Sequence, residues 1–390
     1  MEKQAAYPQI YLAIDNCFAY KRWTSPQDWA RVITELGVRY VEASADTELD
    51  PLYMGKPYLR RWIEQVKQAE EIYDLKVVNL YSGHGTYSTL GLTHTDSGVR
   101  QRMEEEWFRP MIETAASLEA GMGFFAHGFS ETVMQDAEEY EQYRQVLIDT
   151  LGRLTAYGAE TGCGKLGVEQ MYVPYMIPWT MEGTRALLKE VRGNTGHDFY
   201  FTEDLGHHHK KFRMPSREEV RAAFAKKDRS LWLGADKTAA IYDRALERGE
   251  LSHEDLEEIE KQMQQNQRFF AGERDGDCYE WLRELGCYSP IIHLQQTDGV
   301  TSAHKPFTKE MNQWGKIDGQ RVLKALKESY DRETEAGMPK RCGKIYLTLE
   351  LFSSTTQTTR EILDAYKESV QYWRQFIPED GKNLAELLKE

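Results

Sequence analysis

Short apolar runs that favour β-strands alternate along this chain with amphipathic stretches that favour helices, and the pair occurs eight times. The expected strands cover residues 9–15, 38–44, 76–82, 123–128, 165–169, 199–204, 290–294 and 344–351. Apolar residues at helical spacing follow them, for example in residues 57–74 and 137–159. The eighth unit favours a closed parallel barrel, the (β/α)8 or TIM-barrel fold, over an open doubly wound sheet.

One segment interrupts this alternation. Residues 210–286, between the sixth and seventh expected strands, are polar and rich in helix-forming residues. The segment is far too long for an ordinary connection between a strand and its helix. We therefore predict a single TIM-barrel domain over residues 1–390, with residues 210–286 as a helical insertion after strand six. In one interpretation the insertion covers the barrel mouth or contacts another subunit. In the other it is a solvated helical bundle without a role. Both interpretations stay open.

Four of the expected strands end in a residue that can bind a metal ion. These residues are Glu169, Asp204, His293 and Glu350. The C-terminal ends of the strands carry the active site in a (β/α)8 barrel. Three carboxylates in one dry space would repel each other unless a divalent cation neutralised them. We predict one such ion held by all four residues, with Mn²⁺ preferred for this oxygen-rich set and Mg²⁺, Co²⁺ or Zn²⁺ as alternatives.

Two of these residues also have a structural interpretation. Glu169 is placed where it can cap a helix or pair with an arginine. His293, on an apolar strand, fits the pattern of a core histidine with satisfied hydrogen bonds. The polar residues that follow His293 favour the functional interpretation, because they lie in the loop expected at the barrel mouth.

Further polar residues follow the strand ends. His207 lies three residues after Asp204 and begins a run of three histidines, which cannot all face one point, so we favour His207 alone as a substrate ligand. The other predicted substrate contacts are His84 and His127, beside glycines after strands three and four, and Asp298 and His304, in the loop after strand seven. Turn or core hydrogen bonds are the alternative for His84 and His127, and a solvated loop is the alternative for His207.

Composition argues against some classes of function. The formal net charge is −14, and no basic stripe for nucleic acid is evident. No apolar run approaches the ~20 residues of a membrane-spanning helix, and the N-terminus lacks the pattern of a secretion signal. The five cysteines are odd in number and have no CxxC spacing, which favours reduced thiols in a cytoplasm. We expect a small-molecule substrate, no nucleic-acid or membrane partner, and a possible homo-oligomer.

The order of these residues resembles a known superfamily. Glu on strand five, Asp-x-x-His on strand six, His on strand seven and Glu on strand eight are similar to the xylose isomerase-like TIM barrels, in particular the branch of ketose 3-epimerases and sugar-phosphate isomerases or epimerases. The segments HLQQTDGVTSAH and WGKIDGQRVLKAL also look like the strand-seven loop of that superfamily and the lead into its next helix. The resemblance covers residues 9–376, apart from the insertion.

The resemblance implies roles for individual residues. In those epimerases two glutamates bind the metal and move protons on opposite faces of the sugar, which by position are Glu169 and Glu350. The histidine of the Asp-x-x-His motif holds substrate oxygens, which corresponds to His207. The arginine that those epimerases carry shortly after the strand-seven histidine has no counterpart, because Asp298 and Gly299 occupy that loop.

These residues predict a divalent-metal-dependent sugar isomerase or epimerase that transfers a proton through an enediolate of a ketose, an aldose or a related polyhydroxy carbonyl compound. A metal-dependent lyase or dehydratase acting on a keto-sugar or an oxidised glycoside would start with the same proton abstraction. A phosphodiesterase like the multi-zinc apurinic-site endonucleases of this superfamily is a further alternative. Asp298 and His304, however, are six residues apart rather than two as in those enzymes. A sugar-binding subunit without catalysis is the non-enzymatic alternative.

Overall fold

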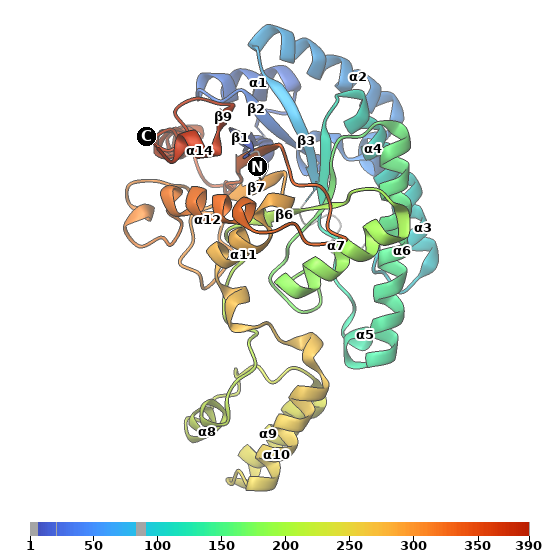
Figure 1. Cartoon of the computed structure of the whole chain (residues 1–390), viewed down its shortest axis with the longest axis vertical. Coiled ribbons are helices and arrows are strands. Elements are labelled where there is room, and N and C mark those ends of the chain that lie inside the picture. Colours follow the sequence, from blue (N-terminus) through green and yellow to red (C-terminus); the bar gives the residue numbers. More distant parts are fainter. Residues whose placement is uncertain (1–6, 21, 83–90, 390) are drawn as a thin grey trace.

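Eight parallel strands form a closed barrel in the computed structural model, which describes residues 7–20, 22–82 and 91–389 (Figure 1). Each strand pairs with the next along the chain, and β1 pairs with both β8 and β2, which closes the ring. The predicted (β/α)8 fold is therefore confirmed. The strands are β1 Gln9–Asp15, β2 Tyr40–Ser44, β3 Lys76–Ser82, β4 Gly121–Phe124, β5 Leu166–Glu169, β6 Tyr200–Asp204, β7 Ile291–Leu294 and β8 Lys344–Leu349.

Helices pack around the outside of this ring (Figure 1). The helices of the barrel wall are α1 Pro26–Glu35, α2 Pro51–Tyr73, α3 Ser97–Met103, α4 Arg109–Ser117, α6 Ala137–Thr161, α7 Met181–Thr195, α11 Cys278–Leu285, α12 Gly319–Asp331 and α13 Thr359–Trp373. The shorter elements are α5 Glu131–Gln135, α14 Leu384–Leu387 and β9 Lys382–Asn383, which pairs antiparallel with β1. Ser25 caps α1 by accepting a hydrogen bond from the Asp28 amide, and Pro26 occupies the first turn.

Two strand ends differ from the prediction. The fourth strand stops at Phe124 instead of residue 128, because the chain then turns and His127 adopts a positive φ of 70° that no strand contains. The last strand stops at Leu349, so Glu350 lies in the loop directly after β8 rather than inside the strand. Both shifts leave the polar residues at the C-terminal mouth of the barrel, where a site was expected.

Side chains inside the barrel change from aromatic to polar along the strands. Tyr11, Tyr40 and Tyr346 pack together near the strand beginnings, with ring centroids 4.8–5.6 Å apart. Because side chains alternate along a strand, the inward positions further along are Glu42 on β2, Thr348 on β8 and their equivalents. Gly123 also faces inward, since a Cβ atom there would lie 3.1 Å from the side chains of Tyr81 and Thr202. An aromatic floor therefore supports a polar layer at the mouth.

Three helices lie between β6 and the barrel helix α11 and extend away from the barrel (Figure 1). They are α8 Arg217–Ala225, α9 Asp236–Arg248 and α10 His253–Gln265. Arg217 on α8 pairs with Glu260 on α10, and α9 packs against α10. Helix α11 packs instead against α7 and α12 of the barrel wall. We therefore propose that the inserted unit ends before α11, whose residues the sequence analysis had assigned to it.

Two features of the described residues bear on the environment of the protein. None of their helices has both the length and the apolar character needed to span a membrane. All five cysteines are free thiols, and four of them are buried.

Glu48, which is buried in the core beside β2, should make the stability of the protein depend on pH. Its buried carboxylate accepts hydrogen bonds from the indoles of Trp29 and Trp62. Burial raises the pKa of Glu48 from 4.5 to about 7, against the opposing effect of these two hydrogen bonds. The folded protein thus holds the proton more tightly than the unfolded chain, so the resulting stabilisation is full below pH 4.5 and is lost as the pH rises through about 7.

We expect Glu48→Gln to remove this pH dependence. At about pH 8 the variant should have a free energy of unfolding higher than the wild type by up to about 3 kcal/mol, because no buried charge remains. At about pH 4.5 the two proteins should differ little. Urea unfolding at both pH values measures the free energy of unfolding of each protein. If the difference between the two proteins is the same at both pH values, the raised pKa of Glu48 is contradicted.

Candidate metal centre

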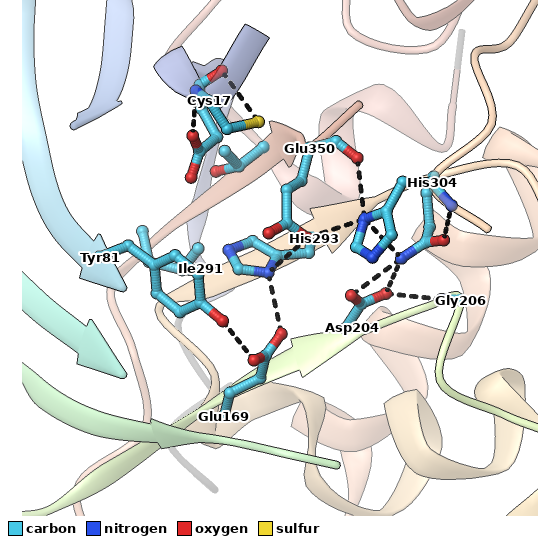
Figure 2. Close-up of polar contacts among 12 residues, drawn as sticks. Cys17, Tyr81, Glu169, Asp204, Gly206, Ile291, His293, His304 and Glu350 are labelled. Carbon is cyan, nitrogen blue, oxygen red and sulfur yellow. Dashed lines mark hydrogen bonds and ion pairs between the residues drawn. The ribbon is translucent and has the colours of Figure 1, made fainter. Parts of the chain in front are cut away.

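The four predicted ligands meet at the barrel mouth (Figure 2). Glu169, Asp204, His293 and Glu350 each offer one ligand atom, and these atoms lie within 4.8 Å of one another. His293 Nδ1 lies 3.3 Å from Glu169 Oε1 and 3.3 Å from Glu350 Oε2. All four side chains are buried. The C-terminal ends of four strands, and the residue that follows one of them, thus bring three carboxylates and one imidazole together.

The imidazole of His293 is oriented by residues that the sequence analysis did not identify. Its Nε2 lies 2.9 Å from Glu42 Oε2, and the amide of Asn79 donates to Glu42 Oε1 at 2.7 Å. The Glu42 carboxylate only accepts hydrogen bonds, so Nε2 carries a proton, and Nδ1, which faces Glu169 and Glu350, is the nitrogen that a metal ion would bind. A carboxylate behind a histidine in this way is a common arrangement in metal sites.

Asp204 is held in place from several directions. The side-chain amide of Gln295 donates to both of its carboxylate oxygens at 2.8 and 2.9 Å. The backbone amide of Gly206 donates to Oδ1 at 2.7 Å, and His207 Nε2 lies 3.2 Å from Oδ2. These contacts fix the carboxylate at the end of β6 with its negative charge facing the cluster.

Glu169 is positioned by an aromatic residue from β3. The hydroxyl of Tyr81 donates to Glu169 Oε2, which leaves Oε1 directed at His293. The Tyr81 ring also packs edge-on against the imidazole of His293, with 4.8 Å between centroids. Burial raises the pKa of Glu169, although its hydrogen bond with His293 acts in the opposite direction. Glu169 therefore combines a fixed orientation with an increased affinity for a proton.

The charges of the cluster require a positive partner. Burial alone would lower the pKa of His293, but Glu350 and Glu42 outweigh it and raise the pKa well above the ordinary value. Burial would raise the pKa of Glu350, yet His293 and His304 hold it well below the ordinary value. Glu350 Oε2 nevertheless accepts no hydrogen bond from the described residues, although His293 Nδ1 and His304 Nδ1 each lie 3.3 Å away. A cation between these atoms would satisfy all of them, so the donor set fits a divalent metal ion.

The remaining predicted residues divide into two groups. His207 and His304 line the cavity beside the cluster, and the His304 ring stacks on Phe352 at 3.8 Å. Asp298 is exposed, and its carboxylate accepts a hydrogen bond from the Val300 amide of its own loop. It does not line either of the two cavities at the barrel mouth that are described below.

His127, the other predicted histidine among the described residues, is not in the walls of the two cavities at the barrel mouth. The ring of His127 is buried against Phe125 and lies where a side chain on Gly91 would collide with it. Burial lowers the pKa of His127 to about 3, so it is neutral at physiological pH. His84 lies outside the described residues.

The run of three histidines separates as its geometry requires. His207 faces the cluster, whereas His208 pairs with Glu203 at 3.1 Å behind β6. His209 packs against Tyr172 and Phe212. Adjacent side chains thus face three different surroundings, and only the first reaches the site.

Two cavities open on either side of the cluster and share Tyr81, Glu350 and Phe352 in their walls. The first, here called the His207 lobe, has a volume of about 320 Å³ and is lined in addition by Glu169, Met171, Tyr172, His207, Ser302, Ala303 and His304. The second, here called the Asp15 lobe, has a volume of about 270 Å³ and is lined in addition by Asp15, Cys17, Tyr20, Ser44, Asp46, Thr47 and Ser353. A small molecule bound at the cluster therefore has room on both sides.

Comparison with known proteins gives one match in sequence. A D-erythrulose 1-phosphate 3-epimerase from Brucella abortus (strain 2308) is 32% identical to the chain over 115 residues, which are 29% of this chain and 34% of that protein. The match thus covers about a third of the relative's length. No protein-family model matches the chain.

Solved structures give a broader match in fold. A protein proposed to be a xylose isomerase from Rhodospirillum rubrum ATCC 11170 superimposes with a TM-score of 0.67 at 18% identity, over 94% of this chain and 99% of that one. A D-psicose 3-epimerase from Clostridium cellulolyticum H10, solved with D-tagatose, gives a TM-score of 0.54 at 11% identity, over 94% and 98%. These matches confirm the predicted resemblance: the chain has the fold of the xylose isomerase-like proteins and ketose 3-epimerases.

Proposed function

We propose that this protein is a divalent-metal-dependent isomerase or epimerase of a small sugar. The observation that carries the proposal is the convergence of Glu169, Asp204, His293 and Glu350 within 4.8 Å between two cavities. The sequence match to a sugar-phosphate 3-epimerase and the shared fold with a ketose 3-epimerase support the same class of reaction. The cytoplasmic location predicted from the cysteines remains part of this proposal.

The four ligands fit a metal that prefers oxygen, and we propose Mn²⁺. When bound, such an ion acts as a Lewis acid that polarises a sugar carbonyl and acidifies the neighbouring C–H group. The imidazole of His293 supplies the nitrogen ligand through Nδ1, because Glu42 holds the proton on Nε2. Gln295 keeps the Asp204 carboxylate directed at the same point.

Glu169 and Glu350 are the proposed acid and base. They come from opposite parts of the ring, β5 and the end of β8, with His293 between them (Figure 2). A sugar held between the two carboxylates would expose one face to each of them, so one removes the proton and either one returns it. Tyr81 fixes Glu169 for this role, and His304 stands beside Glu350. His207, in the wall of the same lobe as Glu169, is proposed to hold a substrate hydroxyl through Nε2, because its Nδ1 donates to the Gln170 carbonyl.

Two alternatives start from the same residues. A lyase or dehydratase on a keto-sugar would use the same proton abstraction and lose a leaving group afterwards, so product analysis separates it from an epimerase. A multi-metal phosphodiesterase needs further ligands, yet Asp298 is exposed in its own loop and His127 is buried against Phe125. Two further groups, Asp204 with His207 and His304, and Asp15 with Glu42 and His293, could hold another cation, so the number of bound ions separates this alternative from sugar chemistry.

The proposal predicts a defined metal requirement. Purified protein loaded with Mn²⁺ should contain about one ion per chain by elemental analysis, and removal with a chelator should abolish exchange of a substrate C–H proton with D₂O. A panel of tetroses, pentoses, hexoses and keto-acids in D₂O identifies the substrate. Full exchange activity in metal-free protein would refute the proposal, and two or three ions per chain would favour the phosphodiesterase.

A further inference from the structure

The Asp15 lobe has a built polar wall that the proposed reaction does not use. It lies on the β1 and β2 side of the cluster, where Figure 2 shows Cys17 on the far side of Glu350 from Asp204. Its polar lining comes from Asp15 at the end of β1 and from Ser44, Asp46 and Thr47 after β2. None of these residues belongs to the proposed ligand set.

Asp15 carries the argument. Its side chain is completely buried, and Oδ1 accepts a hydrogen bond from the Cys17 amide at 2.6 Å. Within the described part of the chain, Oδ2 has no hydrogen-bond partner. A buried carboxylate oxygen without a donor costs considerable free energy. Since Asp15 lines the lobe, a ligand in the lobe can supply that donor.

The charge of the lobe selects the chemistry of the ligand. Asp15, Asp46 and Glu350 bring three carboxyl groups to one small cavity. The charges of Asp46 and Glu350 repel a phosphate or carboxylate group, whereas a sugar hydroxyl can donate to Oδ2 of Asp15. Among the described wall residues of both lobes, no lysine or arginine offsets this charge.

We propose that the Asp15 lobe is a subsite for the uncharged, hydroxyl-bearing end of the substrate, with Asp15 Oδ2 accepting a hydrogen bond from one hydroxyl. The inference rests on the proposed function, because it assumes that a sugar spans the cluster. It adds that the substrate is a free sugar rather than a sugar phosphate, in contrast to the phosphorylated sugar named for the relative from Brucella abortus.

Binding of a non-reacting polyol tests the subsite independently of turnover. We expect the Mn²⁺-loaded protein to bind ribitol at least about 10-fold more tightly than ribitol 5-phosphate in calorimetric titrations. Asp15→Asn should weaken ribitol binding by about 10-fold and so narrow the gap in affinity between the two ligands, because the hydrogen bond from the ribitol hydroxyl to Oδ2 is lost. Asp74→Asn, the same change at a side chain that is 94% exposed at the end of α2, should leave both affinities unchanged.

The outcomes separate the two proposals. Equal or tighter binding of the phosphate ester, or an Asp15→Asn variant with wild-type affinity for ribitol, overturns the subsite. A second metal ion that disappears in Asp15→Asn also overturns it, since Asp15, Glu42 and His293 would then form a metal site of their own. If ribitol binds more tightly than ribitol 5-phosphate as expected, but no sugar of the panel exchanges a proton, the subsite is supported and the proposed isomerase is refuted.

Discussion

Glu169→Gln is expected to abolish exchange of the substrate C–H proton with solvent deuterium while a sugar still binds. The amide occupies the same volume and can still accept the hydrogen bond from Tyr81, but it cannot take up a proton. General-base catalysis typically contributes ~10²–10⁴-fold, so the exchange rate should fall by about 10³-fold or more. Deuterium incorporation measured by NMR under saturating substrate gives the rate directly.

The same substitution removes a charge from the proposed metal site, so metal content has to be measured alongside. Saturation with Mn²⁺ and elemental analysis separate loss of the base from loss of the ion. Glu203→Gln is the matched control, because Glu203 is equally buried but pairs with His208 behind β6, away from the cluster. Near-normal exchange in Glu169→Gln, with metal bound, would remove Glu169 from its catalytic role.

Glu350→Gln should distinguish the two faces of the sugar. If Glu169 and Glu350 act on opposite faces, each single variant loses exchange from one epimer first. Starting from the two epimers separately therefore gives opposite orders of impairment for the two variants. Identical profiles for both variants and both epimers would contradict a two-base mechanism.

The barrel and the convergence of the candidate ligands at its mouth were predictable because each depends on local patterns. Eight apolar runs of strand length followed by amphipathic stretches leave few topologies, and a ligand at a strand end must lie at the barrel mouth. Glu169, Asp204 and His293 are therefore found from the sequence alone. The boundary errors at the ends of β4 and β8 have a local cause, since strand propensity reveals neither the positive φ of His127 nor the end of regular pairing after Leu349.

The residues that orient the ligands were missed for a different reason. Glu42, Asn79 and Tyr81 lie on the second and third strands, where no ligand motif drew attention to them. The alternation in VRYVEAS, which puts Tyr40, Glu42 and Ser44 on one face, was an available signal. Their partners, however, are far away in sequence: Glu42 contacts a histidine 251 residues later, which only the closed ring makes adjacent.

Loop residues were harder still. His304 and Asp298 belong to the same loop, yet one lines the site and the other faces solvent. Spacing does not separate them, because the loop is held by distant contacts: the His304 amide donates to Gln295 Oε1 at 2.6 Å, and its ring stacks on Phe352. Side-chain direction in a loop follows from such contacts rather than from its own sequence.

Glu42→Gln is expected to weaken Mn²⁺ binding by about 10–100-fold without unfolding the protein. In the wild type the two oxygens of Glu42 accept from two different donors, Asn79 and His293. Glutamine offers only one oxygen, so its NH₂ group must face one of these donors. If the NH₂ group faces His293, it donates to Nε2 and so favours the tautomer with the proton on Nδ1. The metal then loses its nitrogen ligand, because it needs the lone pair of Nδ1.

A second substitution tests this explanation against simple disruption of the core. In Glu42→Gln/Asn79→Asp, the new carboxylate at position 79 accepts from the glutamine NH₂ group, which returns the glutamine oxygen to His293 Nε2. Metal affinity should then recover most of the lost factor, and the ¹⁵N shifts of His293 should return to the Nε2–H tautomer. If the single variant binds Mn²⁺ normally, or the double variant binds it no better than the single one, Glu42 does not set the tautomer. The imidazole would then be oriented by its packing against Tyr81.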